Sequence, residues 1–149
     1  MILVSACLLG ECCKYSGGHN RSQAVIDYLQ GHEYLTICPE VFGGLPTPRP
    51  PAEIVGGTAK DIIDGRAQIY NNQGQDVTAS FLADAFKVAK MASEYQAKAA
   101  ILQDRSPSCG VNKVYDGSFT GCLKPGMGVT ALLLQDLGLK LFVEEDLLS

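Results

Sequence analysis

Tryptophan is absent from the 149 residues, and charged residues make up only 19% of the chain. The sequence also lacks internal repeats, low-complexity tracts and linker-like segments, so we expect one domain spanning residues 1–149. No apolar run approaches the ~18 residues needed to cross a membrane, and the apolar start has no charged segment of the kind that begins a secretory signal. We therefore expect a cytoplasmic protein with no membrane partner.

Basic charge is scarce as well, because 12 Lys and Arg residues stand against 16 Asp and Glu residues, for a net charge of -4. A protein that binds duplex nucleic acid normally carries a basic stripe. The charge balance therefore argues against duplex nucleic acid as a partner and leaves a small free substrate open.

The chain is rich in cysteine and glycine, with 6 and 16 residues. The cytosol keeps thiols reduced, so these cysteines indicate metal, cluster or redox chemistry and not a disulfide framework. No Cys-x-x-Cys pair occurs, which weakens both a zinc ribbon and a thioredoxin-like dithiol.

Short apolar runs alternate with helical patterns, which predicts an α/β fold: a single domain with a mostly parallel, Rossmann-like sheet, helices on both faces and long cysteine-bearing loops. The expected strands cover residues 2–7, 34–38, 99–103 and 139–144, and the expected helices cover 23–29, 128–137 and a stretch from Asp76 or Thr78 to about residue 96. Two more short strands are expected at 62–63 and 67–70, and a long irregular loop at the Pro- and Gly-rich residues 39–57.

Three of the expected strands each lead into a cysteine, namely Cys7, Cys38 and Cys109. In an open parallel sheet, ligands bind outside the carboxyl ends of the strands, so these three thiols are expected to converge. The alternative is that each is a small buried hydrophobe, which is harder to accept for three equivalent positions. Cys122 has no partner at a useful spacing and is expected to serve in packing.

Three thiolates permit more than one centre. With Cys13 as a fourth ligand they suit a closed structural zinc or a fully ligated cluster. Without it they hold a [4Fe–4S] cluster through three irons and leave the fourth iron open as a Lewis acid. The spacing favours the open cluster, while a structural zinc protein and a cysteine-based sulfur-relay or redox module remain alternatives.

Two polar residues accompany the second cysteine. Glu40 stands two residues after Cys38, so on an extended segment both side chains point to the same side, and a carboxylate there is a candidate general base. Arg49 lies between two prolines, and its planar guanidinium group is suited to binding an anionic or carbonyl group of a substrate. The alternative for both residues is a solvated surface position.

Ser106 and Ser108 flank a proline immediately before Cys109. Their hydroxyl groups are candidates for orienting a substrate beside the third cysteine. The alternative is ordinary hydrogen bonding within a turn.

Several long motifs run in one order through essentially the whole chain. They are VSACLLG (4–10), YSGG (15–18), CPEVFGGLPTPRPP (38–51), SPSCG (106–110), YDG (115–117) and GVTALL (128–133). In these segments the chain resembles a small bacterial family that includes the thiouracil desulfidases. Two positions differ from the family: Ser16 stands where aspartate is frequent, and the family does not uniformly have cysteine at the position of Cys13.

The resemblance implies an α/β fold with an oxygen-sensitive [4Fe–4S] cluster held by Cys7, Cys38 and Cys109. It also implies a small thiolated nucleobase as substrate, whose C=S bond is polarised by the metal in a non-redox reaction. Glu40 would then handle the proton of the attacking water, and Ser106 would position the base. The sulfur would leave as sulfide.

Overall fold

A four-stranded parallel sheet with the order β2-β1-β5-β8 forms the centre of the fold. The computed structural model describes residues 1–9, 21–37 and 50–147, apart from the side chain of Cys7. The strands are β1 (Ile2–Ser5), β2 (Tyr34–Ile37), β5 (Ala99–Ile101) and β8 (Lys140–Phe142). The predicted α/β class and the mostly parallel sheet are confirmed.

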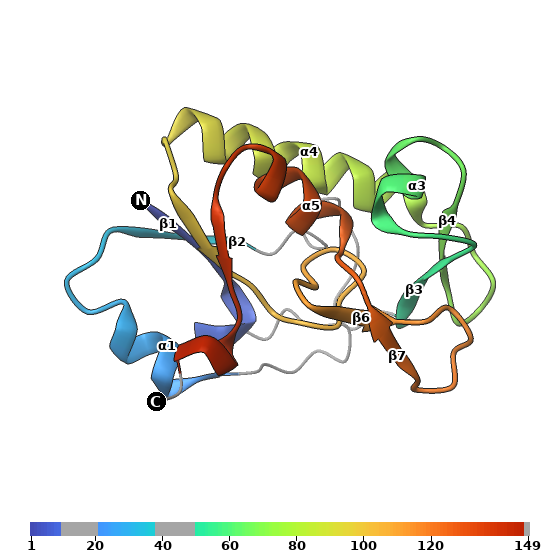
Figure 1. The fold of residues 1–149 in the computed structure, drawn as a ribbon, viewed down its shortest axis with the longest axis horizontal. Helices are drawn as coiled ribbons and strands as arrows, with labels where there is room; N and C mark the ends of the chain where they lie inside the picture. The colour runs from blue at the N-terminus through green and yellow to red at the C-terminus, as the bar shows by residue number, and fades with distance from the viewer. Residues whose placement is uncertain (10–20, 38–49, 148–149) are drawn as a thin grey trace.

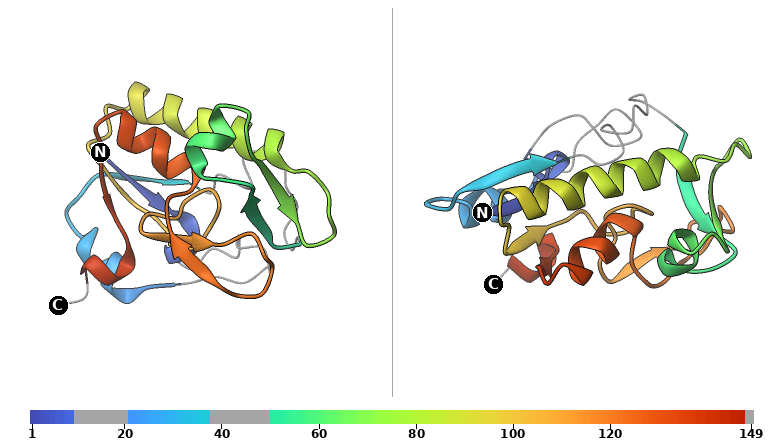
Figure 2. Two further views of the ribbon diagram at one scale, coloured as in Figure 1. Left: turned by 45° about the vertical axis from the view of Figure 1, so that its right-hand side comes forward. Right: turned by 90° about the horizontal axis from the view of Figure 1, so that it is seen from above.

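Helices cover both faces of this sheet (Figure 1). The helices α4 (Thr78–Glu94) and α5 (Val129–Asp136) lie side by side on one face, and α1 (Gln23–Tyr28) lies on the other with the 3-10 turn η2 (Glu144–Leu147) (Figure 2). Successive residues of a strand face opposite sides. Accordingly, Leu3 packs with α4 and α5, whereas Ile2 and Val4 pack with α1. None of the described helices is long and apolar enough to cross a membrane.

Two antiparallel hairpins lie outside the parallel sheet. The first consists of β3 (Ala52–Val55) and β4 (Gln68–Asn71), with α3 (Ala59–Ile63) between them, and it packs on the amino-terminal half of α4 (Figure 1). The second consists of β6 (Lys113–Tyr115) and β7 (Leu123–Pro125). Residues 116–122 connect β6 to β7.

Three expectations for individual segments are wrong. Residues 62–63 form the end of α3 and not a strand, because Thr58 and Asp61 make a capping box that starts a helix at Ala59. Residues 52–55 form β3, although they fall in the irregular loop expected at 39–57. Residues 39–49 of that loop lie outside the described residues. Cys122 is exposed and not packed in the core. The other predicted elements are present, with ends shifted by a few residues.

Candidate metal centre

The carboxyl ends of β2, β1 and β5 lie next to one another in the sheet. Ser5 and Ile37, the last residues of β1 and β2, are register partners, and the Ser5 hydroxyl accepts the Gln103 N–H just beyond β5 at 3.1 Å. Cys7 lies in the 3-10 turn η1 (Ala6–Leu9), two residues after β1 ends. In the sequence, Cys38 directly follows Ile37.

Several predicted site residues belong to the part of the chain that the structure leaves undescribed. These are Cys38, Glu40 and Arg49, together with the side chain of Cys7. Among the described side chains, no group of three or more His, Cys, Asp and Glu residues is placed to hold a metal ion. Because Cys38 and the side chain of Cys7 are not described, a metal site formed by the three cysteines stays a prediction.

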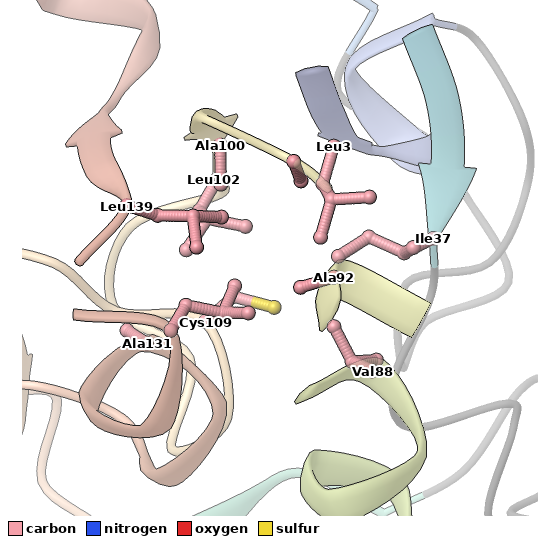
Figure 3. Packing of buried hydrophobic residues seen from close by; sticks show 11 residues of the cluster. Leu3, Ile37, Val88, Ala92, Ala100, Leu102, Cys109, Ala131 and Leu139 are labelled. Atoms are coloured by element: carbon pink, nitrogen blue, oxygen red, sulfur yellow. The ribbon is translucent and has the colours of Figure 1, made fainter. Parts of the chain in front are cut away.

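Cys109 is buried, with 4% of its surface exposed. Its sulfur points toward Val88 and Ala92 on the inner face of α4, and Leu3 and Ile37 of the sheet belong to the same apolar cluster (Figure 3). The third cysteine of the prediction thus lies between the sheet and α4. A cofactor bound there would be screened from bulk water on the side of the helix.

The turn that carries Cys109 is held by the hydroxyl of Ser106. This oxygen accepts the backbone N–H of Ser108 at 3.0 Å and that of Cys109 at 3.2 Å. The N–H of Gly110 donates to the Ser106 carbonyl at 2.9 Å. Ser106 therefore makes the hydrogen bonds within a turn that the sequence analysis gave as the alternative role. A contact of Ser106 with a substrate stays a prediction.

The same turn docks on the start of α5. Gly128, the N-cap residue, has no side chain to cap the helix, so the first N–H groups need partners from elsewhere. The carbonyl groups of Pro107, Ser108 and Gly110 supply them, accepting the N–H groups of residues 128–131 at 2.8 to 3.1 Å. The loop of Cys109 and the amino end of α5 consequently form one hydrogen-bonded unit.

Two glycines permit this close docking. A Cβ atom on Gly128 would overlap the Ser108 carbonyl group and lie 2.8 Å from the Cys109 nitrogen. A Cβ atom on Gly110 would lie 2.8 Å from the Ser106 carbonyl oxygen and 2.7 Å from a methyl group of Val114. These contacts explain the glycines of the SPSCG and GVTALL motifs, whose structural role the sequence analysis missed.

Ser108 makes a buried hydrogen bond with Thr130. The two hydroxyl oxygens are 2.6 Å apart, and both side chains are completely buried. A buried hydroxyl needs such a partner to offset its loss of water. This hydrogen bond joins the turn around Cys109 to α5. The contact of Ser108 with a substrate stays a prediction.

A pocket of about 450 Å³ lies beside α1, away from these residues. It is lined by Leu9, Ile26, Leu29, Gln30, Gly31, His32 and Tyr34. The described candidate residues Ser106, Ser108 and Cys109 do not line it, so this pocket is separate from the Cys109 turn.

The donor set suits an iron–sulfur cluster. Cysteine thiolates are the usual ligands of such clusters, and the three candidate cysteines follow three adjacent parallel strands at the edge where α/β sheets bind ligands. Cys109 comes from a loop that is fixed by its own hydrogen bonds, which is how a protein positions a ligand before the metal arrives.

Comparisons with known proteins identify the family of the chain. The family model described as 2-thiouracil desulfurase matches residues 2–146. The chain is 43% identical over 147 residues to the protein YbbK of Bacillus subtilis, covering 99% of this chain and 97% of the relative. A solved structure described as the [4Fe–4S]-dependent thiouracil desulfidase TudS superposes with a TM-score of 0.84 and 38% identity, covering 97% of this chain and 91% of the other.

Proposed function

Because the chain belongs to the 2-thiouracil desulfurase family, we propose that it replaces the sulfur of a thiolated pyrimidine by oxygen, with a [4Fe–4S] cluster held by Cys7, Cys38 and Cys109. The observation that supports the proposal most is the order β2-β1-β5, because each of these three adjacent parallel strands is followed in the sequence by one of the three cysteines. The likeness to TudS, which is described as [4Fe–4S]-dependent, supports the same cofactor. Free thiols and an oxygen-sensitive cluster suit a reducing cytoplasm.

The proposed reaction is a hydrolysis without net electron transfer. The oxygen of water forms a bond to the thiocarbonyl carbon, the C–S bond breaks, and the sulfur leaves as hydrogen sulfide while the pyrimidine gains a carbonyl group. A bound cluster with three protein ligands supplies an open iron, which acts as a Lewis acid toward the thiocarbonyl sulfur.

The residues of the chain have distinct parts in this proposal. Glu40 takes a proton from the attacking water as general base. Ser106 positions the pyrimidine from the turn that its hydroxyl oxygen holds through two backbone N–H groups. Arg49 binds a carbonyl or anionic group of the substrate, and Ser108 supports the substrate site from its buried position beside Cys109.

Anaerobic reconstitution tests the cofactor with a matched pair of cysteine variants. Cys109→Ser removes a proposed ligand, whereas Cys122→Ser changes an exposed cysteine at the second hairpin. We expect the wild type and Cys122→Ser to bind about four iron and four sulfide per chain and to convert thiouracil to uracil and sulfide. Cys109→Ser should lose both the cluster and the turnover.

Three results would contradict this proposal. One is a Cys109→Ser protein that binds as much iron and sulfide as the wild type and converts thiouracil at the same rate. Another is about one tightly bound zinc per chain, whose removal unfolds the protein. The third is a persulfide on one cysteine of an active, iron-free protein, detected by mass spectrometry of the intact chain.

Replacement of the general base separates catalysis from cofactor binding. Glu40→Ala should keep the cluster and lower kcat by about 10²–10⁴-fold, the range for removal of a general base. The rate of sulfide release and the iron content are measured on the same sample. Full activity of Glu40→Ala would exclude the role proposed for this carboxylate.

A further inference from the structure

Asp104 closes the base of the loop that carries Cys109. One carboxylate oxygen, Oδ1, accepts the backbone N–H groups of Arg105 at 3.1 Å, Val111 at 2.9 Å, Asn112 at 3.2 Å and Lys113 at 3.3 Å. Three of these donors lie seven to nine residues further along the chain. A single oxygen atom thus joins the two ends of the loop.

The backbone at this closure departs from common geometry. Arg105 has a φ of 77°, a left-handed conformation that is unfavourable for any residue except glycine. Its N–H also donates to the Lys113 carbonyl at 3.0 Å, and Arg105 forms an isolated parallel bridge with Val114. The surrounding bonds must hold Arg105 in this conformation, and the carboxylate of Asp104 makes several of them.

Asp104 and Ser106 hold different parts of the same loop. Ser106 bonds to the turn around Cys109, whereas the bonds of Asp104 lie at the loop ends. Four backbone N–H groups from both ends of the loop converge on the one oxygen of Asp104, so this closure contributes much of the rigidity of the loop. Loss of this acceptor would leave the loop ends joined by the bond from Arg105 to the Lys113 carbonyl, and the loop anchored by its contacts with α5.

We propose that Asp104 is a positioning residue, which fixes the loop so that Cys109 is held in place for the cluster before the cluster binds. This inference rests on the proposed function, because it assigns Cys109 as a ligand. A ligand that is already ordered loses less conformational entropy on binding. Asp104 should therefore affect how long the cluster is retained, without touching the substrate.

Three variants test the role of the acceptor. Asp104→Ala removes it, and Asp104→Asn keeps a carbonyl oxygen that can accept N–H groups but carries no charge. Asp116→Ala is the matched control, since Asp116 also accepts a backbone N–H within its own turn, that of Ser118 at 2.9 Å in the second hairpin. Unfolding of each protein in urea shows how much of any effect is global.

The first readout is the rate at which each reconstituted protein loses iron to a chelator under argon. The second uses the cluster-free proteins and measures alkylation of Cys109 by iodoacetamide with peptide mass spectrometry. In the wild type this thiol should be protected by its burial. We expect Asp104→Ala to raise both rates by about tenfold or more, as local opening of the loop would, and Asp104→Asn and Asp116→Ala to stay within about threefold of the wild type.

Three outcomes would overturn the inference. Asp104→Ala can match the wild type in both rates. Asp116→Ala can lose iron as fast as Asp104→Ala at an equal loss of stability, which would make the effect global. Asp104→Asn can behave as Asp104→Ala does, which would assign the effect to charge and not to closure. If no protein takes up a cluster, the proposed function fails, and alkylation of Cys109 still decides whether Asp104 positions it.

Discussion

At the scale of single residues, small and hydroxylated side chains determine how the Cys109 turn meets α5. Gly110 and Gly128 leave room for backbone contact, and Ser106 bonds to two N–H groups of the turn. The Ser108 hydroxyl then joins Thr130 in a dry environment. From the sequence, Ser106 and Ser108 could be recognised as residues of the site, but turn bonding and substrate binding demand the same residue types, so the sequence could not separate these roles.

A double-mutant cycle on Ser108 and Thr130 distinguishes a structural from a substrate-binding role. Ser108→Ala should lower the free energy of unfolding by about 1–3 kcal/mol, because it leaves the buried Thr130 hydroxyl without its partner. Thr130→Val should do likewise, and the double variant should lose less than the sum of the two single losses, with a coupling of about 0.5–3 kcal/mol. Urea unfolding measures these values.

The kinetics of the same variants complete this test. If Ser108 serves only the turn, Ser108→Ala and Thr130→Val should change KM for thiouracil to a similar extent. A rise in KM confined to Ser108→Ala would instead support the direct substrate contact predicted from the sequence. Losses of stability that simply add would contradict a coupled buried pair.

At the scale of elements, sequence patterns identified α4 and the strands that lie in longer apolar runs, and they failed on β3, β6, β7 and α3. The helix α4 spans 17 residues and carries a clear apolar face, so its period was readable. The strands β3, β6 and β7 have only three or four residues, too few to show alternation. The five-residue helix α3 contains the β-branched pair at 62–63, which resembles a strand, and the capping box at Thr58 and Asp61 was the signal that could have corrected the prediction.

The capping box of α3 predicts a pH dependence of stability. Hydrogen bonds from the backbone and side chain of Thr58, and then from Arg66, lower the pKa of Asp61 below its ordinary value. A lowered pKa in the folded state means that the ionised form stabilises the fold above the ordinary pKa. This contribution is lost as the pH falls through the pKa of the folded state.

Asp61→Asn tests this dependence, because the amide keeps an acceptor for the cap and cannot ionise. Between about pH 6 and pH 3, the wild type should lose more stability than the variant in urea unfolding experiments. The difference should be small, since the side chain of Arg66 is largely exposed and water weakens its ion pair with Asp61. If the free energy of unfolding of the two proteins changed with pH in the same way, Asp61 would not contribute to the pH dependence of stability.

At the scale of the whole molecule, the sequence predicted the parallel sheet whose strands precede the three cysteines. The apolar runs before Cys7, Cys38 and Cys109 form strands, of which β1 is buried along its length whereas β2 buries only Ile37. Their parallel pairing followed from the helical segments between them. The two hairpins could not be foreseen in the same way, because contacts distant in the sequence stabilise them. Glu53 illustrates this: its buried carboxylate accepts the N–H groups of Gly117 and Phe119, at 2.9 and 3.3 Å, from 64 and 66 residues further along the chain.

Glu53 therefore joins the two hairpins, and its replacement should separate them. Glu53→Ala leaves two N–H donors without their acceptor and should lower the free energy of unfolding by about 1–3 kcal/mol. Glu53→Gln keeps an acceptor oxygen and should lower it by less. Glu94→Ala serves as a control, since Glu94 makes only an exposed ion pair with Lys90 at 3.8 Å and should change stability by less than about 1 kcal/mol.

Hydrogen exchange of residues 113–125 locates the effect of Glu53. In Glu53→Ala the amides of the second hairpin should exchange faster, while those of β1 and β5 in the central sheet change only as much as global stability does. Uniform acceleration throughout the chain would mean that Glu53 stabilises the molecule as a whole and does not join the hairpins locally. Equal effects of Glu53→Ala and Glu94→Ala would show that the long-range bonds are energetically unimportant, and the hairpins would then depend on apolar packing alone.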